Sequence, residues 1–182
     1  MNYDAEKHHR RSIRLAGYDY RAAGAYFVTI CSHQKKRVFG RVLDGEMQMH
    51  VYGRIVAECW DEITDHYPQV IVDEWIVMPN HCHGILIIVD APVGARYISP
   101  LHAASRIGAP AGSLGSVIGK FKAAATRRIN AHRAERNLSP AVVWQRNFYE
   151  RIIRDEKELI ATRRYIIENP LHWEQDTENQ HV

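Results

Sequence analysis

Residues 70–89 read VIVDEWIVMPNHCHGILIIV, which is two apolar runs separated by the pair Pro79-Asn80. Residues that favour strands, the β-branched and aromatic ones, dominate both runs, and a proline followed by an asparagine is typical of a turn. The stretch therefore predicts two adjacent antiparallel strands, at 70–78 and at 83–89.

Two histidines, His81 and His83, lie at the junction of these strands. Because side chains alternate along a strand, both imidazoles share one face while Cys82 points to the other. Two imidazoles on one face can bind a single divalent ion, but a His-x-His pair also occurs at ordinary strand edges. The pair is a candidate for half of a metal site.

Apolar periodicity predicts the other elements. We expect a buried strand at 25–31, a hairpin around Asp44-Gly45, amphipathic helices at 51–63 and from 114 to about 136, a strand at 142–146, a strand-like or turn segment at 148–153, and a last helix from Asp155 to about Asn169. The buried stripe of the second helix should consist of Leu114, Val117, Ile118, Phe121, Ala125 and Ile129. The order β-α-β-β-α-β-α predicts an α+β ferredoxin-like antiparallel sheet, the split βαβ pattern, with helices on one or both faces and an added C-terminal helix.

The last helix carries a second candidate, Tyr165. Its apolar side on a helical wheel consists of Leu159, Ile160, Ile166 and Ile167, and Tyr165 lies nearly opposite, with Asn169 one turn later. This placement makes Tyr165 a candidate for chemistry, but the pattern alone favours a partly buried or interface tyrosine, and Asn169 before Pro170 is equally well explained as an ordinary helix terminator. Arg163 interrupts the apolar side, so we expect it to extend to solvent or to meet a negative charge.

The composition indicates a single domain whose basic residues could bind a polyanion such as nucleic acid. The chain has 182 residues, 46% of them hydrophobic, which is enough for a sizeable core, and its net charge is +3. Basic residues gather in an N-terminal arm at 1–24 and on the second helix. The candidate contacts to nucleic acid are Arg10, Arg11 and Arg14 in the arm and Lys120, Lys122 and Arg127 on the helix. These side chains could contact phosphates or simply form a solvated surface.

Several classes of protein are excluded by what the sequence lacks. The three cysteines have no C-x-x-C spacing, which argues against a zinc knuckle or a disulfide framework and favours the reducing cytoplasm. We find neither a signal peptide nor an apolar run that could span a membrane, and no G-x-x-x-x-G-K-[ST] loop of an ATPase. Residues 90–113 are predicted to form a long loop, and residues 174–182 a polar tail.

Three segments together resemble the HUH single-tyrosine transposases: PNHCHG at 79–84, the pair Trp144-Gln145, and YIIENP at 165–170. The match is in the order of that family and covers most of the chain, which places the transposase domain at 25–173. The pattern Tyr-x-x-x-Asn-Pro is most similar to the REP-associated tyrosine transposases, because their insertion-sequence relatives usually carry glutamine at the position of Asn169.

The resemblance implies an activity. Tyr165 would cleave single-stranded DNA that contains a hairpin, leaving a 5′-phosphotyrosine and a free 3′-hydroxyl that can later rejoin the strand. A free tyrosine has a pKa of about 10, so a cation must polarise the phosphate, and His81, His83 and Asn169 would bind it as Mg²⁺ or Mn²⁺. The basic arm and helix would contact the DNA, and the protein would act as a monomer or as a homodimer.

Three other interpretations stay open from the sequence. The chain could be a binding module for single-stranded nucleic acid without catalysis, since the same scaffold serves that role. It could be a metal-dependent hydrolase whose nucleophile is water. Finally, Tyr149 could replace Tyr165 as the nucleophile, although no polar residue follows it four positions later.

Overall fold

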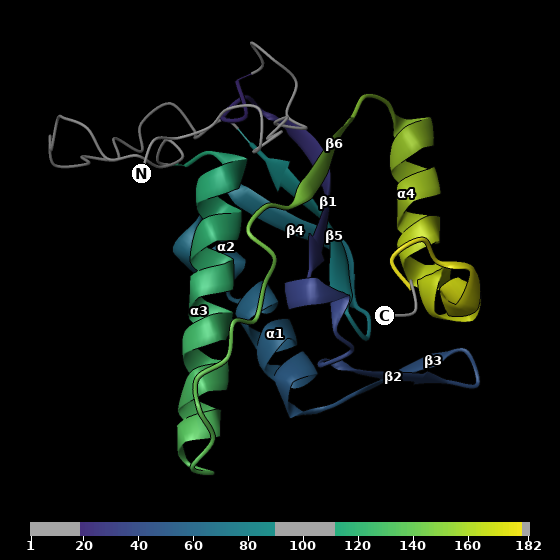
Figure 1. Ribbon diagram of the computed structural model, residues 1–182. Helices are drawn as coiled ribbons and strands as arrows, with labels where there is room; N and C mark the ends of the chain where they lie inside the picture. Colours follow the sequence, from purple (N-terminus) through teal and green to yellow (C-terminus); the bar gives the residue numbers. More distant parts are fainter. Residues whose placement is uncertain (1–18, 90–111, 180–182) are drawn as a thin grey trace, which may run out of the picture.

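The computed structural model describes residues 19–89 and 112–179, and its centre is a four-stranded antiparallel sheet (Figure 1). The strands are β1 (Gly24–Cys31), β4 (Val70–Val77), β5 (His81–Ile88) and β6 (Tyr149–Ile153), in the order β4-β5-β1-β6. A 3-10 turn, η1 (His33–Lys35), and a hairpin of β2 (Gly40–Leu43) and β3 (Glu46–Met49) connect β1 to the first helix.

Helices cover both faces of the sheet. One face carries α1 (Val51–Asp61), α2 (Ile63–His66) and α3 (Leu114–Ala134), and the other carries α4 (Glu156–Glu168) and the 3-10 helix η2 (Asn169–Gln175) (Figure 1). This strand order with these crossovers is ferredoxin-like, so the predicted α+β fold with an added C-terminal helix is confirmed. Among the described residues, no helix combines the length and apolar composition that a membrane crossing needs.

Alternation along the strands gives the sheet two different faces. Toward α1 and α3, a large core contains Tyr26, Val28, Ile30, Cys82 and Leu86 together with all six predicted positions of α3. Toward α4, a small core contains Phe27, Ile85, Ile153 and Ile166. The two histidines of β5 alternate with Cys82 and therefore lie on this second, thinly covered face.

The apolar side of α4 differs from the predicted one. Ile160 and Ile167 are 50% and 60% exposed, while Ile166 is buried. Arg163 forms an ion pair with Asp73 at the β4 edge, with a closest distance of 2.6 Å, and this pair holds the helix in a rotation different from the predicted one. Of the two outcomes expected for Arg163, solvent or a negative charge, the second is therefore confirmed. In this orientation Tyr165 faces the sheet.

The predicted strand at 142–146 is wrong. This segment makes a single bridge, between Ser32 and Trp144, and the fourth strand of the sheet is β6. The reason is that side chains of α3 bind its backbone: Lys122 Nζ donates to the carbonyls of Gln145 and Asn147, at 2.9 and 2.7 Å. The backbone of the segment bonds instead at the end of β1, where the His33 amide donates to the Val143 carbonyl at 2.8 Å and the Gln145 amide donates to the Cys31 carbonyl at 3.0 Å.

Other boundaries shift by one to two residues. The second strand of the hairpin begins at His81, two residues before the predicted start, because the Met78 amide already pairs with the His81 carbonyl across the turn. The expectations for residues 1–18, for most of the loop at 90–113 and for the last three residues lie outside the described residues.

Gly84 of β5 lies so close to α1 that a side chain has no room. A Cβ atom there would overlap the Trp60 ring, so we expect Gly84→Ala to lower the free energy of unfolding by about 1–3 kcal/mol through overpacking. Gly119→Ala in α3 is the matched control: the space around it is open, and we expect a gain of about 0.5–1 kcal/mol from helix propensity. Urea unfolding measures both, and equal stability of the two variants would contradict this packing.

Candidate active site

Two imidazoles meet at the start of β5. His81 Nε2 lies 3.0 Å from His83 Nε2, and both side chains are buried, His81 against Trp173 of η2 and His83 against Tyr165 of α4. They meet because residues two apart on a strand share a face. Two nitrogens at this distance can converge on one cation.

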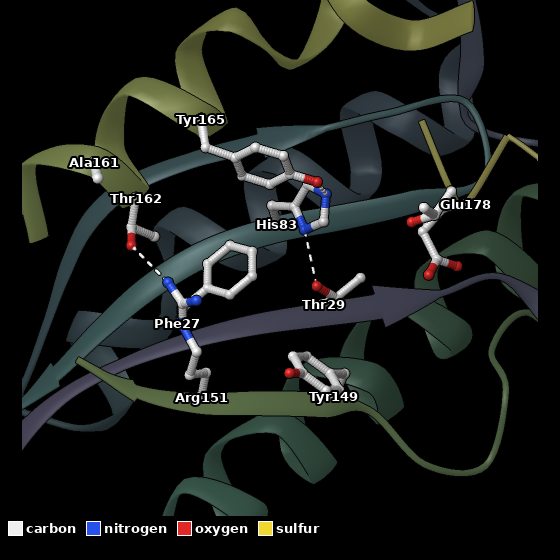
Figure 2. A pocket seen from close by; sticks show the side chains of 10 residues that line it. Phe27, Thr29, His83, Tyr149, Arg151, Ala161, Thr162, Tyr165 and Glu178 are labelled. Atoms are coloured by element: carbon white, nitrogen blue, oxygen red, sulfur yellow. Dashed lines mark hydrogen bonds between the residues drawn. The ribbon is translucent and has the colours of Figure 1, made fainter. Parts of the chain in front are cut away.

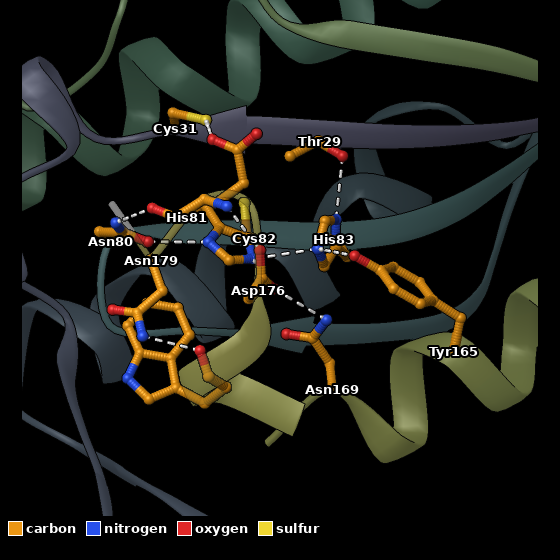
Figure 3. A network of polar contacts seen from close by, with 12 residues as sticks. Thr29, Cys31, Asn80, His81, Cys82, His83, Tyr165, Asn169, Asp176 and Asn179 are labelled. Carbon is orange, nitrogen blue, oxygen red and sulfur yellow. Dashed lines mark hydrogen bonds and ion pairs between the residues drawn. The ribbon is translucent and has the colours of Figure 1, made fainter. Parts of the chain in front are cut away.

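Each imidazole is held from its other side. Asn80 Oδ1 lies 2.8 Å from His81 Nδ1, and Thr29 Oγ1 lies 2.9 Å from His83 Nδ1 (Figure 3). An amide oxygen can only accept, so His81 carries its proton at Nδ1 and presents a lone pair at Nε2. Sequence reasoning missed both partners. Asn80 directly precedes His81, but Thr29 meets His83 only through the pairing of β1 with β5.

Burial keeps these imidazoles neutral. It lowers the pKa of His81 to about 3, with a smaller contribution from the charge of Lys35. Burial also lowers the pKa of His83 well below its usual value, and the neighbouring His81 adds to the effect, while Asp176 opposes it. Only a neutral imidazole can bind a metal ion, so both histidines stay able to act as ligands well below neutral pH.

Tyr165 projects from α4 to the same pair. Its hydroxyl oxygen lies 3.3 Å from His83 Nε2, and its ring packs edge-on against Phe27. Burial and the charge of Asp176 raise the pKa of Tyr165 above its usual value, while a hydrogen bond with Asn169 lowers it. The phenol is therefore in place beside the histidines, and without a nearby positive charge it keeps its proton at neutral pH.

Asn169 lies close to the pair together with a residue that sequence reasoning missed, Asp176. Asn169 Nδ2 donates to Asp176 Oδ2 at 3.1 Å, and the same carboxylate oxygen lies 3.9 Å from His81 Nε2 (Figure 3). One ligand atom each from His81, His83 and Asp176 lies within 4.8 Å of the other two. The only sequence signal for Asp176 is a carboxylate shortly after Pro170, which is too common to select it.

These residues fit a divalent cation. Asn169 Oδ1 is buried and has no hydrogen-bond partner among the described residues, which is unusual for a native protein unless an ion or water satisfies it. Neutral imidazoles with carboxylate and amide oxygens form a mixed donor set that suits first-row divalent metals. His81 and His83, together with Asp176, Asn169 or both, therefore supply three or four ligand atoms of suitable kinds for one divalent cation.

The C-terminal segment is anchored over this site by several polar contacts. Asn80 Nδ2 donates to the Glu178 carbonyl at 2.7 Å, and Lys35 pairs with the Glu178 carboxylate at 3.0 Å. Arg37 donates to Asn179 Oδ1 at 2.7 Å. The division of the chain into an arm at 1–24, a domain at 25–173 and a tail at 174–182 stays a prediction, and residues of that expected tail contact the site.

The expected DNA contacts do not gather at the histidines. Lys120 and Arg127 are exposed on α3, on the opposite face of the sheet (Figure 1). Lys122 is engaged with the two carbonyls described above, and burial lowers its pKa to about 8. Arg10, Arg11 and Arg14 lie outside the described residues.

A cavity of about 550 Å³ opens beside Tyr165 (Figure 2). Tyr149, the alternative nucleophile, lies in its wall on β6 and is 50% exposed. Among the described residues, Tyr165 contacts His83 and Tyr149 contacts neither histidine. The geometry therefore favours Tyr165 as the residue next to a bound ion.

Replacing each candidate ligand in turn should show how much it contributes to the affinity for a metal ion. We expect His81→Ala to weaken Mn²⁺ binding by more than about 100-fold and Asp176→Ala and Asn169→Ala by about 10-fold each, as for direct ligands or their close supports. Calorimetric titration measures this, with Asp65→Ala, an exposed acid of α2, as the control. Undiminished binding by Asp176→Ala would remove that carboxylate from the site.

The buried histidines should also make the ion-free protein sensitive to acid. An unfolded histidine takes up a proton near pH 6.5, whereas burial in the folded state keeps the pKa of His81 near 3. The unfolded state then binds more protons below pH 6.5, so stability must fall as the pH drops, by at most about 1.4 kcal/mol per pH unit for each histidine. Urea unfolding with a chelator from pH 7.5 to 5 tests this, and the variant with His81→Gln and His83→Gln should have a shallower slope.

Comparisons with known proteins agree with this architecture. No protein-family model matches the chain. An uncharacterized protein of Haemophilus influenzae is 42% identical over 176 residues, which are 96% of this chain and 95% of that protein. A REP-associated tyrosine transposase, solved bound to a REP hairpin, has a similar structure with a TM-score of 0.58 at 16% identity, over 90% of this chain and 74% of its own. The chain thus belongs to one family with the Haemophilus influenzae protein, and its fold is that of the HUH single-tyrosine transposases, as the His81-Cys82-His83 and Tyr165 motifs predict.

Proposed function

We propose that this protein is a transposase-type enzyme that cleaves and rejoins single-stranded DNA through a 5′-phosphotyrosine. The observation that carries the proposal is the 3.3 Å between the Tyr165 hydroxyl oxygen and His83 Nε2, an atom that itself lies 3.0 Å from His81 Nε2. A nucleophile beside a metal site is the arrangement that phosphoryl transfer to a side chain requires.

The transfer conserves the number of phosphodiester bonds. A bond forms between the Tyr165 oxygen and phosphorus, and the bond from phosphorus to the 3′ oxygen breaks. The phenol releases its proton to solvent, and the departing 3′ oxygen takes one up. Because the phosphotyrosine keeps the energy of the broken bond, the free 3′-hydroxyl can reverse the step without a nucleotide cofactor.

His81, His83 and Asn169 are the ligands we propose for Mg²⁺ or Mn²⁺, with Asp176 as an added ligand or as the group that orients the Asn169 amide. The ion would supply positive charge at the phosphate and at the developing phenolate. The chain itself would supply position: α4 holds the Tyr165 oxygen at His83, and Asn80 and Thr29 hold the two imidazoles.

We further propose a folded single strand with a hairpin as the substrate. The solved relative named above was bound to a REP hairpin, and the basic residues Arg10, Arg11, Arg14, Lys120 and Arg127 would suit a phosphate backbone. We propose that the protein acts on this DNA in the cytoplasm, as a monomer or as a homodimer.

Adduct formation on a denaturing gel tests this function. The protein is mixed with labelled hairpin DNA that has single-stranded flanks, and with Mn²⁺ or Mg²⁺. We expect a covalent protein–DNA species that disappears with Tyr165→Phe and falls by at least about 100-fold with His81→Ala, since the metal is lost. Tyr149→Phe, the matched hydroxyl deletion in the same cavity, should keep the adduct.

Each alternative has its own result in this assay. Loss of the adduct in Tyr149→Phe alone would move the nucleophile to that residue. Cleavage without an adduct would indicate a hydrolase that uses water. Binding without cleavage, over a panel that includes hairpins flanking the gene, would indicate a binding module.

A further inference from the structure

We propose that the cavity beside Tyr165 is a binding site for one unstacked nucleotide, in which Tyr149 stacks on the base and Arg151 contacts its phosphate. The inference rests on the proposed function, because the nucleotide would be a neighbour of the phosphate that Tyr165 attacks. It assigns the edge strand β6 a role in substrate binding.

The cavity has the size and the position for such a ligand. Its volume of about 550 Å³ lies within the range of roughly 300–1,000 Å³ that small-molecule pockets have. His83, Thr29 and Tyr165 form one end, which is the reacting end, and Tyr149 and Arg151 form the other (Figure 2). A nucleotide in it would therefore reach from the candidate nucleophile to the sheet edge.

Strand register places Tyr149 in line with the candidate metal site. Thr29 of β1 pairs with His83 on one side and with Tyr149 on the other, so the three side chains form one row across the sheet. Two strand spacings separate the ends of this row, about 10 Å between backbones. An aromatic ring at that distance is suited to an adjoining base, since every base has a face that stacks.

Tyr149 is an aromatic residue that packing against the described residues does not bury. It is 50% exposed at the free edge of the sheet, and neither hydrophobic core includes it. Exposed aromatic side chains on a sheet are the usual stacking platforms for single-stranded nucleic acids.

Arg151 follows two residues later on the same face of β6, with its side chain 51% exposed. Its Nε pairs with Glu158 at 3.1 Å and one terminal nitrogen bonds Thr162 Oγ1 at 3.4 Å, which orients the guanidinium along α4 (Figure 2). The other terminal nitrogen has no partner among the described residues, and guanidinium N–H groups match phosphate oxygens well. The Glu178 carboxylate at the rim pairs with Lys35 at 3.0 Å, which offsets part of its negative charge.

An abasic scan tests the stacking contact. Binding of fluorescent hairpin DNA is measured by anisotropy in the Tyr165→Phe background, where no adduct can form, using flanks that each lack one base. We expect Tyr149→Ala to weaken binding of the intact DNA by about 5- to 150-fold, the range that base stacking supplies. This loss should vanish at one abasic position only, and Tyr149→Phe should bind normally.

Two further variants keep the test independent of folding. Tyr149→Thr, which retains a strand-forming residue, should behave like Tyr149→Ala, and Ile167→Ala, which truncates a still more exposed apolar side chain of α4, should bind normally. Normal binding by both Tyr149→Ala and Tyr149→Thr, or a loss that is the same at every abasic position, would overturn the proposal.

The phosphate contact has a separate measurement. Arg151→Gln should reduce the salt dependence of binding by about one unit of slope, and this reduction should disappear when one flank phosphate is replaced by an uncharged methylphosphonate. Lys157→Gln removes the same charge from the exposed surface of α4 and is the control. In this variant, replacing the one flank phosphate should weaken binding as much as it does in the protein with Arg151 and Lys157. No dependence of the Arg151→Gln effect on any single phosphate would contradict the assignment.

Failure of this site and failure of the proposed function give different results. If the wild-type protein forms the adduct but no flank position is coupled to Tyr149, the nucleotide site is wrong and the enzyme stands. If no adduct forms but one position is coupled to Tyr149, the nucleotide site stands in a protein that binds DNA without cleaving it.

Discussion

The register between β1 and β5 is the constraint on which the rest of the site depends. It pairs Cys31 with His81 and Thr29 with His83, and so directs both imidazoles to the face that α4 covers. A slip of one residue would turn the histidines into the large core and Cys82 toward α4. The large core resists this slip, because Val28, Leu86 and Cys82 are all buried against α1 and α3.

The second constraint is the position of α4. Ile166 packs against Phe27 and Ile85, and the ion pair of Arg163 with Asp73 holds the helix to the other edge of the sheet. Together they fix the rotation of the helix, and this rotation brings Tyr165 and Asn169 to the histidines. A helix that rests on such a small core depends on a few contacts, so its orientation is sensitive to each of them.

The polar contacts around the site link segments that are far apart in the chain. Asn80 connects His81 to the C-terminal segment through the Glu178 carbonyl, and Asp176 connects the same segment to Asn169. These groups are buried in pairs, which compensates most of the cost of removing them from water. The exception among the described residues at this site is the Asn169 oxygen, the atom best placed to bind an added ion.

The sequence by itself determined the local features: the hairpin at Pro79-Asn80, the buried stripe of α3, and the common face of His81 and His83. These follow from periods of 2 and 3.6 residues, which a chain carries in its local pattern. Only the tertiary structure decided that Tyr165 meets His83 across 82 residues of chain, that α4 faces the sheet with Ile166 and not Ile160, and that Asp176 joins the site. The reason is that such contacts depend on packing and ion pairs between distant segments, and these leave no periodic signal in the sequence.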